Sequence, residues 1–174
     1  METNMSIELF EQKYHLYKNL IFHIAFTYVK NKEDCEDIIQ EVFIKYMWNR
    51  QEFEDDEHEK RWLIKVTVNQ CKNFLKLFWN KNKVIMEDFE KLNLSTENQD
   101  ILLEVMSLPR KYKIVIYLHY YEGYKCREIG EILDQKESTI KMRLKKGREL
   151  LGIQIEKGKE GGDMDEERRI KLCI

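Results

Sequence analysis

The sequence predicts an all-α protein made of two small helical domains joined by a flexible linker. Only 7 glycines and 1 proline occur among 174 residues, and residues of high helix propensity are abundant. Apolar residues recur every three or four positions in several stretches, as on the buried face of an amphipathic helix. Hydrophobic residues make up 43% of the chain, so a core can be buried. These features exclude collagen-like, low-complexity and β-sandwich folds.

The first two helices are expected over Ile7–Val29 and Lys32–Arg50. The apolar stripe of the first is Ile7, Phe10, Tyr14, Tyr17, Ile21, Ile24 and Tyr28. Asn31 is suited to cap the second helix, with Asp34 at the capping-box position. The buried face predicted for this second helix is Cys35, Ile38, Ile39, Val42, Phe43 and Tyr46.

The other side of the second helix carries Asp37, Gln40, Glu41 and Ile44 at i, i+3, i+4 and i+7. Two acids, an amide and an aliphatic residue on one exposed face are compatible with a protein partner. The pattern alone leaves a simply solvated face open.

An acidic loop, Gln51–Glu57, leads into a third helix over about Glu59–Lys81. Its inward residues are expected to be Leu63, Val66, Cys71, Phe74 and Phe78. Another face carries Lys65, Asn69, Lys72 and Lys76, with Trp62 one turn earlier. Cations beside an amide and an aromatic ring suit a nucleic-acid strand, which offers phosphates and stacking bases. A solvated lysine stripe beside a core tryptophan is the alternative.

Residues 82–99 show weak periodicity and are the best linker candidate. They separate an N-terminal domain, 1–81, from a C-terminal domain, 100–152, which a polar tail follows at 153–174. In the second domain a helical segment begins near Asp100. Ser107 is expected to cap the next helix, which starts near Pro109 and stops before Gly123.

A short helix over Cys126–Leu133, a turn over Asp134–Lys136 and a basic helix over Glu137–Leu151 predict a helix-turn-helix. The inward residues of the last helix are Ile140, Leu144 and Leu151. Its basic residues are Lys141, Arg143, Lys145, Lys146 and Arg148, a cluster that attracts the phosphates of DNA. Basic membrane-surface helices need a larger apolar face with aromatic residues, which this helix lacks.

The net charge of −2 conceals strong segregation. Residues 59–85 carry +6 and residues 108–150 carry +5, whereas residues 1–58 carry −7 and residues 86–107 carry −5. Two basic segments separated by an acidic one suggest two contacts with a polyanion, although lysines also simply solvate helices.

Other classes of function find little support. The chain contains no GxxxxGK[ST], HExxH, GxSxG or GxGxxG motif, so no enzyme activity and no cofactor are expected. Four cysteines without CxxC spacing and four dispersed histidines indicate reduced thiols and no metal site. The polar N-terminus is unlike a secretory signal, and no apolar stretch is long enough to span a bilayer. We therefore expect a cytoplasmic protein without membrane insertion.

Three segments together resemble the ECF (extracytoplasmic function) family of RNA polymerase sigma factors in the sigma-70 superfamily. DIIQEVFIKYMWNR, at 37–50, resembles their second conserved region, and WLIKVTVNQCKNFLK, at 62–76, resembles the helix that reads the −10 promoter element. Residues 108–150, from LPRKYK to KKGREL, resemble their fourth region. The resemblance covers about residues 8–151 and implies promoter-specific transcription initiation with core polymerase.

The resemblance also implies roles for individual residues. Asp37, Gln40, Glu41 and Ile44 match the face that binds the β′ clamp helices of core polymerase. Trp62, Lys65 and Asn69 match the segment that holds single-stranded −10 DNA, with Lys72 and Lys76 on phosphates. Met142, Lys145 and Lys146 match positions facing −35 bases, while Lys141, Arg143 and Arg148 would neutralise phosphates. The β flap of polymerase and an anti-sigma factor are further implied partners. The alternative is a helix-turn-helix regulator that acts without core polymerase.

The chain departs from the family pattern at three positions of the helix-turn-helix. Lys125 and Lys136 stand where hydroxyl-bearing caps are usual, and Asp134 stands where the turn usually has glycine. Each lost cap costs about 1 kcal/mol, and a cation at a helix N-terminus adds a dipole penalty. We therefore hypothesise that this motif is locally weak when free and becomes more ordered on DNA.

Overall fold

A computed structural model describes residues 6–49, 52–79 and 105–158 of the chain. These ranges contain helices and turns and no strand, which confirms the all-α class. Residue contacts divide the chain into two compact units, one within residues 1–90 and the other within 91–174. The predicted linker, 82–99, lies outside the described residues, as do Cys173 and the end of the tail. The domain boundaries at 81, 99 and 152 therefore stay predictions.

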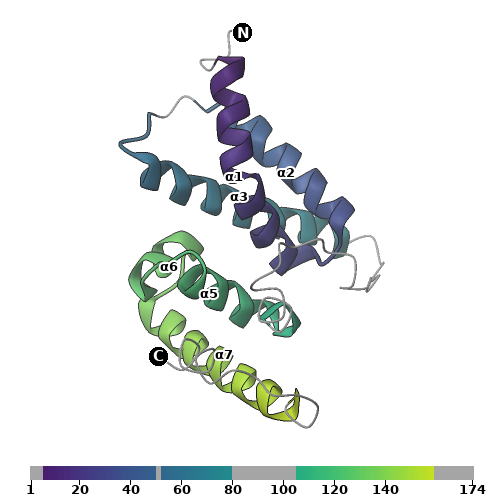
Figure 1. The fold of residues 1–174 in the computed structure, drawn as a ribbon, viewed down its shortest axis with the longest axis vertical. Coiled ribbons are helices and arrows are strands. Elements are labelled where there is room, and N and C mark those ends of the chain that lie inside the picture. Colours follow the sequence, from purple (N-terminus) through teal and green to yellow (C-terminus); the bar gives the residue numbers. More distant parts are fainter. Residues whose placement is uncertain (1–5, 50–51, 80–104, 159–174) are drawn as a thin grey trace. The chain divides into compact units, whose positions relative to one another are not determined.

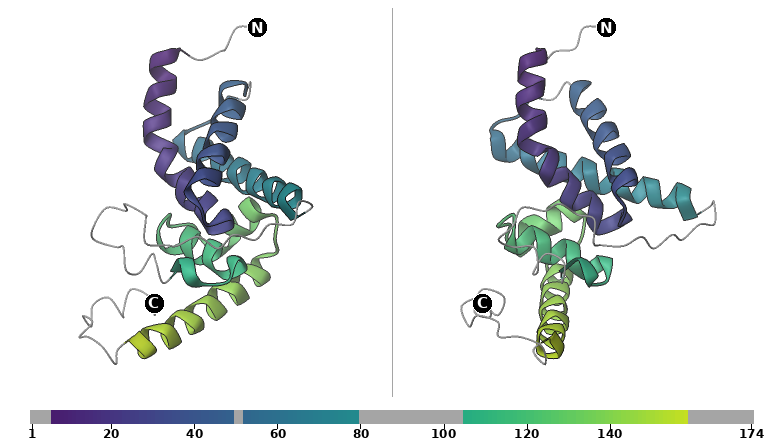
Figure 2. Two further views of the ribbon diagram at one scale, coloured as in Figure 1. Left: turned by 90° about the vertical axis from the view of Figure 1, so that its right-hand side faces the viewer. Right: turned by 45° about the vertical axis from the view of Figure 1, so that its right-hand side comes forward.

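The first unit is formed by α1 (Ile7–Val29), α2 (Lys32–Met47) and α3 (Asp56–Trp79), which pack against one another (Figures 1 and 2). The predicted cap of α2 is confirmed, because the Asp34 backbone N–H donates to Asn31 Oδ1 at 2.8 Å. At the start of α1, the Leu9 N–H donates to Ser6 Oγ at 3.2 Å. Lys30 adopts a left-handed conformation, φ 60°, and reverses the chain between α1 and α2.

Two helix boundaries in the first unit differ from the sequence prediction. Helix α2 ends at Met47 rather than Arg50, since the Asn49 N–H bonds the Tyr46 carbonyl at 3.1 Å and tightens the last turn. Helix α3 begins at Asp56, inside the segment predicted to be an acidic loop. Its start is set by Asp55, whose Oδ1 accepts from the His58 N–H at 2.6 Å, so the acids of its first turn lie at the positive end of the helix.

The core of the first unit combines apolar residues from all three helices. All six residues predicted for the buried face of α2 are buried. Of the α1 stripe, Tyr17, Ile21 and Ile24 are buried, but Ile7 is 78% exposed because the first turns of α1 extend beyond the other helices (Figure 1). In α3 the prediction of Leu63 and Cys71 is confirmed, whereas Val66 and Phe74 are only half-buried and Phe78 lies outside the described side chains. Ile64, Thr67 and Val68 of α3 are also buried.

The second unit contains α5 (Arg110–Tyr120), α6 (Cys126–Leu133) and α7 (Glu137–Gly158), preceded by helical residues 105–107 (Figure 1). Helices α5 and α6 both pack against α7. The predicted bounds of α6 and the burial of Ile140, Leu144 and Leu151 are confirmed. Gly123, φ 77°, follows α5, and the Tyr124 N–H next to it bonds the Leu118 carbonyl at 3.0 Å.

The second unit differs from the sequence prediction at two places. The N-cap residue of α5 is Pro109 rather than Ser107; Pro109 makes no side-chain cap bond, and its ring presets the backbone for the helix that follows. Helix α7 does not stop at Leu151 but continues to Gly158, because Gly152 is followed by residues that a helix accepts.

Candidate functional site

The predicted partner-binding face of α2 is open to solvent. Asp37, Gln40 and Glu41 are exposed, and Ile44 is 48% exposed. Trp48, the C-cap residue of α2, is 51% exposed and follows Ile44 by four residues on the same face. An aliphatic and an indole side chain exposed beside two carboxylates form an amphipathic patch of the kind that partner proteins cover.

The predicted DNA-facing stripe of α3 is also open to solvent. Lys65, Asn69, Lys72 and Lys76 are all exposed and follow one another along the helix. Trp62, at the head of this stripe, is half-buried. Its ring centroid lies 5.6 Å from that of Phe53 and 6.2 Å from that of Tyr46. One part of the indole is therefore packed while another part stays available.

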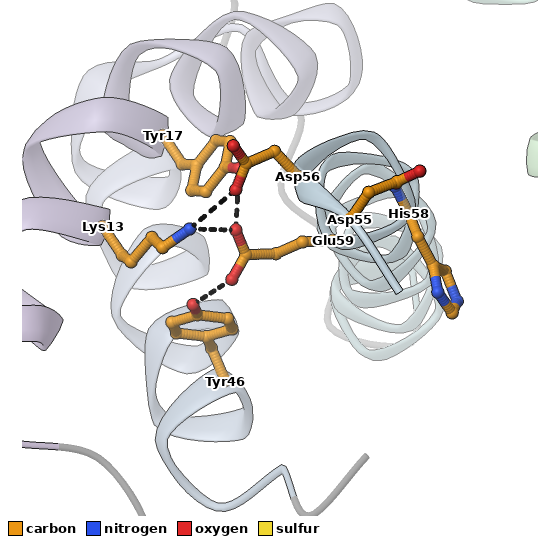
Figure 3. Close-up of polar contacts among 7 residues, drawn as sticks. All are labelled: Lys13, Tyr17, Tyr46, Asp55, Asp56, His58 and Glu59. Atoms are coloured by element: carbon orange, nitrogen blue, oxygen red, sulfur yellow. Dashed lines mark hydrogen bonds and ion pairs between the residues drawn. The ribbon is translucent and has the colours of Figure 1, made fainter. Parts of the chain in front are cut away.

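A buried carboxylate lies one turn before Trp62, and Figure 3 shows its surroundings. Glu59 is 5% exposed. Its Oε2 accepts from Lys13 Nζ at 2.5 Å and from the Tyr17 hydroxyl at 2.8 Å, while the Tyr46 hydroxyl donates to Oε1 (Figure 3). Lys13 also pairs with Asp56 at 3.3 Å. This Glu59 network joins α1, α2 and α3 through one side chain.

The Glu59 network perturbs its three donors. Burial is the main reason that the pKa values of the Tyr17 and Tyr46 phenols are raised, and the hydrogen bonds to Glu59 raise them further. For Lys13, burial alone would lower the pKa, but the bonds to Glu59 and Asp56 outweigh it, so the pKa is raised. All three groups are thus kept protonated as donors to the carboxylate.

The Glu59 network was missed at the sequence level. Glu59 lies four residues before the core residue Leu63, so it falls on the buried face of α3, where an acid needs partners. Two tyrosines on the buried stripes of α1 and α2 were the available signal, but only the packing of the helices shows that they meet.

The helix-turn-helix has a tight turn between α6 and α7. Asp134 occupies the left-handed region at φ 54°, ψ 54°, and the Gln135 N–H bonds the Gly130 carbonyl at 2.9 Å. A Cβ on Gly130 would lie 2.7 Å from the Gln135 carbonyl oxygen. Glycine is therefore required inside α6, and the turn accepts aspartate instead of glycine at 134, a residue type that tolerates this conformation better than most.

Backbone hydrogen bonds partly replace the missing side-chain caps at the starts of α6 and α7. Lys125, the N-cap residue of α6, has no side-chain acceptor, but its backbone N–H donates to Glu128 Oε2 at 2.8 Å. This is the second half of a capping box. Before α7, the Lys136 carbonyl accepts from the Thr139 and Ile140 N–H groups at 2.9 and 3.1 Å. The hypothesis of a weakly capped motif therefore applies mainly to the start of α7, at Lys136.

The basic residues of α7 lie on its solvent side. Lys141, Met142, Lys145 and Lys146 are exposed, with Met142 at 64%, while Arg143 and Arg148 are half-buried. Lys141 pairs with Glu137 at 2.7 Å, which raises the pKa of the lysine, and Lys146 pairs with Glu149 at 3.1 Å. Gly147 faces the opposite way, where a Cβ would lie 2.9 Å from Ile116 Cγ1 of α5. Close packing on one side thus leaves the cationic side free for a partner.

Other kinds of site find no support in the described ranges. The described residues contain no group of three or more His, Cys, Asp or Glu side chains placed to hold a metal ion. No helix among them is long and apolar enough to cross a membrane.

Comparisons with known proteins give the same two-part division. Residues 14–77 match the family model for sigma-70 region 2, and residues 98–151 match the model for sigma-70 region 4. The RNA polymerase sigma factor SigV of Bacillus subtilis is 30% identical over 148 residues, spanning 81% of this chain and 87% of that protein. The ECF RNA polymerase sigma factor SigW of the same organism is 26% identical, spanning 80% and 85%.

A solved structure shares the fold. The sigma factor RpoE of Bartonella quintana, crystallised with the anti-sigma factor NepR, superposes with a TM-score of 0.65 at 18% identity, covering 84% of this chain and 96% of that one. Fold and matched regions together define a promoter-specificity factor for transcription. The chain belongs to the ECF family of RNA polymerase sigma factors, whose partners are core RNA polymerase and promoter DNA. The alternative of a regulator that acts without core polymerase is not favoured.

Proposed function

We propose that this sigma factor binds core polymerase through the exposed face of α2. Asp37 and Glu41 supply charge, Gln40 supplies a two-way hydrogen-bonding group, and Ile44 and Trp48 supply apolar area. A coiled coil such as the β′ clamp helices would suit this face, because coiled-coil helices carry charged side chains beside their apolar seam. The β flap would be the contact for the second unit.

The −10 element is assigned to the exposed stripe of α3. Lys65, Lys72 and Lys76 would neutralise backbone phosphates, and Trp62 offers an aromatic surface for a base. Asn69, between the lysines, can donate and accept at once and is our choice for reading an unstacked base. The exposed cationic stripe with an anchored tryptophan at its head is the observation that carries this proposal.

The −35 element is assigned to α7 as duplex DNA. Met142, Lys145 and Lys146 would face base edges, where a lysine can donate to guanine O6 and N7. Lys141, Arg143 and Arg148 would bind phosphates. The Lys141–Glu137 and Lys146–Glu149 pairs would be exchanged for DNA contacts, at small cost because both pairs are exposed.

In vitro transcription with purified core polymerase and a random promoter library tests the proposal as a whole. We expect defined start points that need both the chain and the core enzyme, with shared −10 and −35 sequences among the selected promoters. Specific promoter binding by the chain alone, without stimulation of core, would favour the helix-turn-helix regulator instead.

The α2 assignment is tested by Asp37→Ala and Gln40→Ala. Because both side chains are exposed, each variant should fold normally and lose about 1–2 kcal/mol of core affinity, as central interface residues do. Glu36→Ala is the matched control, since Glu36 is exposed on α2 outside this face and pairs with the exposed Lys32 at 3.7 Å. Equal core affinity for all three variants would contradict the assignment.

Further partners follow from this function. The chain performs no bond chemistry itself and acts in the cytoplasm, where promoter DNA and polymerase are found. An anti-sigma factor is proposed as a third partner because the structural neighbour was crystallised with one. Binding of a co-expressed anti-sigma candidate should then compete with core polymerase for the chain.

A further inference from the structure

Tyr46 makes two different kinds of contact. Its side chain is 2% exposed, on the inner side of α2. The hydroxyl donates to Glu59 Oε1 in the Glu59 network (Figure 3). The ring lies against two other rings, 6.2 Å from Trp62 and 6.4 Å from Phe53, and is nearly parallel to Phe53 with 16° between the planes. Hydroxyl and ring thus hold different partners.

These contacts converge on the start of α3. Glu59 and Trp62 are three residues apart and share one side of the helix, so Tyr46 touches the same turn at two points. Phe53, from the segment before α3, closes the group with its ring 5.6 Å from Trp62. Two points of contact fix both the rotation of α3 against α2 and the plane of the indole.

Tyr46 lies on the opposite side of α2 from the exposed face that carries Ile44. Ile44, two residues earlier, lies on the exposed face proposed for core polymerase, while Tyr46 points into the unit. The same helix therefore meets the polymerase on one side and holds the head of the DNA-facing stripe on the other.

We propose that Tyr46 is a positioning residue for −10 recognition. Its hydroxyl bond to Glu59 and its ring contact with Trp62 hold the indole in the orientation that single-stranded DNA requires. A base stacks on an aromatic ring only if the plane of that ring is set in advance, so a rotating indole captures the strand poorly. The inference rests on the proposed role of Trp62, Lys65 and Asn69.

Tyr17 provides a matched control. Its hydroxyl donates to the same carboxylate at 2.8 Å, and it is similarly buried at 5% exposure. Within the described residues, however, Tyr17 makes no ring contact with Trp62 or Phe53. Tyr17→Phe and Tyr46→Phe therefore each remove one hydrogen bond to Glu59, and only the second removes the anchor of a ring that lies against Trp62 and Phe53.

The test compares the two variants in complex with core polymerase. The probe is a single-stranded oligonucleotide carrying the −10 sequence of a promoter selected from the random library. We expect Tyr46→Phe to weaken oligonucleotide binding about fivefold, a fraction of one base-stacking contact, without a change in core affinity. Tyr17→Phe should leave both affinities unchanged. Equal losses in the two variants, or no loss in Tyr46→Phe, would overturn the inference.

A spectroscopic measurement separates positioning from stability. In a chain with Trp48→Phe and Trp79→Phe, the remaining fluorescence reports on Trp62. Tyr46→Phe should shift this emission to longer wavelength, and Tyr17→Phe should not. Phe53→Leu, which leaves the Glu59 network intact, should act like Tyr46→Phe and serves if that variant folds poorly. Identical emission from all these variants would contradict the proposed positioning.

Asn69→Ala distinguishes failure of this inference from failure of the proposed function. If Asn69→Ala weakens oligonucleotide binding and Tyr46→Phe does not, the positioning role alone is wrong. If neither variant affects binding, the −10 assignment of α3 is wrong, and the role of Tyr46 falls with it.

Discussion

Single buried polar residues have a large effect on the stability of each unit of this sigma factor. Glu59 is the clearest example, because a carboxylate at 5% exposure is tolerated only with donors on both oxygens. Lys113 is another: it is fully buried on α5, and its Nζ donates to the Met106 carbonyl at 3.3 Å. Removing one partner of such a buried group lowers the free energy of unfolding by much more than the intact interaction contributes to it.

Glu59→Ala should therefore destabilise the first unit by about 3 kcal/mol, since two buried tyrosine hydroxyls would lose their acceptor. Urea unfolding measures this loss. Asp56→Ala is the control, because that side chain is 91% exposed and its pair with Lys13 contributes little. A loss for Asp56→Ala as large as that for Glu59→Ala would show that surface charge at the helix start, and not the buried network, matters.

Gly130→Ala should destabilise the second unit by about 1–3 kcal/mol, because a Cβ there meets the Gln135 carbonyl oxygen at 2.7 Å and opens the turn. Binding to −35 duplex DNA should fall with it. Gly152→Ala, also in a helix but with nothing within 4 Å of the new Cβ, should be neutral or stabilising by up to about 1 kcal/mol. Thermal unfolding and DNA titration compare the two; matching losses would refute the steric explanation.

At the scale of elements, the hydrogen bonding of helix N-termini and the contacts between helices determine local stability. The start of α6 is bonded through Glu128, whereas α7 begins after Lys136, a cation at the positive end of the helix dipole. DNA phosphates would supply both acceptors and negative charge at that point.

Amide exchange should therefore slow markedly over residues 134–140 when a −35 duplex binds, and less over residues 126–133, where Glu128 already bonds the helix start. Hydrogen-exchange mass spectrometry with and without the duplex measures the difference. Uniform protection of the whole motif in the free chain would contradict a weakly capped α7.

The Glu59 network, which joins α1, α2 and α3, should make the stability of the first unit sensitive to alkaline pH. The pKa values of Tyr17, Tyr46 and Lys13 are all raised above their ordinary values of 10.0 and 10.5. A raised pKa stabilises the folded state fully below the ordinary value, and this stabilisation is lost as pH rises through the raised one. The free energy of unfolding should thus fall above pH 10, and fall less steeply in Tyr17→Phe, as urea unfolding across that range would show.

At the scale of the whole molecule, we expect the segregation of charge along the chain to determine where DNA binds. Residues 59–85 carry +6 and residues 108–150 carry +5 on a chain with a net charge of −2. Strong basic segments on a slightly acidic protein concentrate the attraction to phosphates at two places and limit non-specific binding elsewhere.

Lys72→Ala should accordingly weaken binding of −10 single strands by the core-bound chain to a similar degree for every sequence. It should also reduce the slope of log affinity against log salt by about 0.7, the value for one phosphate contact on a single strand. Lys32→Ala, an exposed lysine on α2 away from the stripe, should change neither. An unchanged slope for Lys72→Ala would remove that lysine from the DNA interface.

The spacing of apolar and charged residues along the chain is enough to predict the helical class, the bounds of α1 and α6, the exposed faces of α2 and α3 and the basic face of α7, because it sets which side of a helix is buried. The packing of the helices was needed to find that Glu59 meets Tyr17 and Tyr46, that Tyr46 reaches Trp62, and that Gly130 and Gly147 leave no room for a Cβ. In the first unit, these contacts join residues that are 13 to 42 positions apart in the sequence, and in the second unit they bring α5 against α7. Helical periodicity carries no information on how two faces are aligned against each other, since that alignment follows from side-chain packing between the helices.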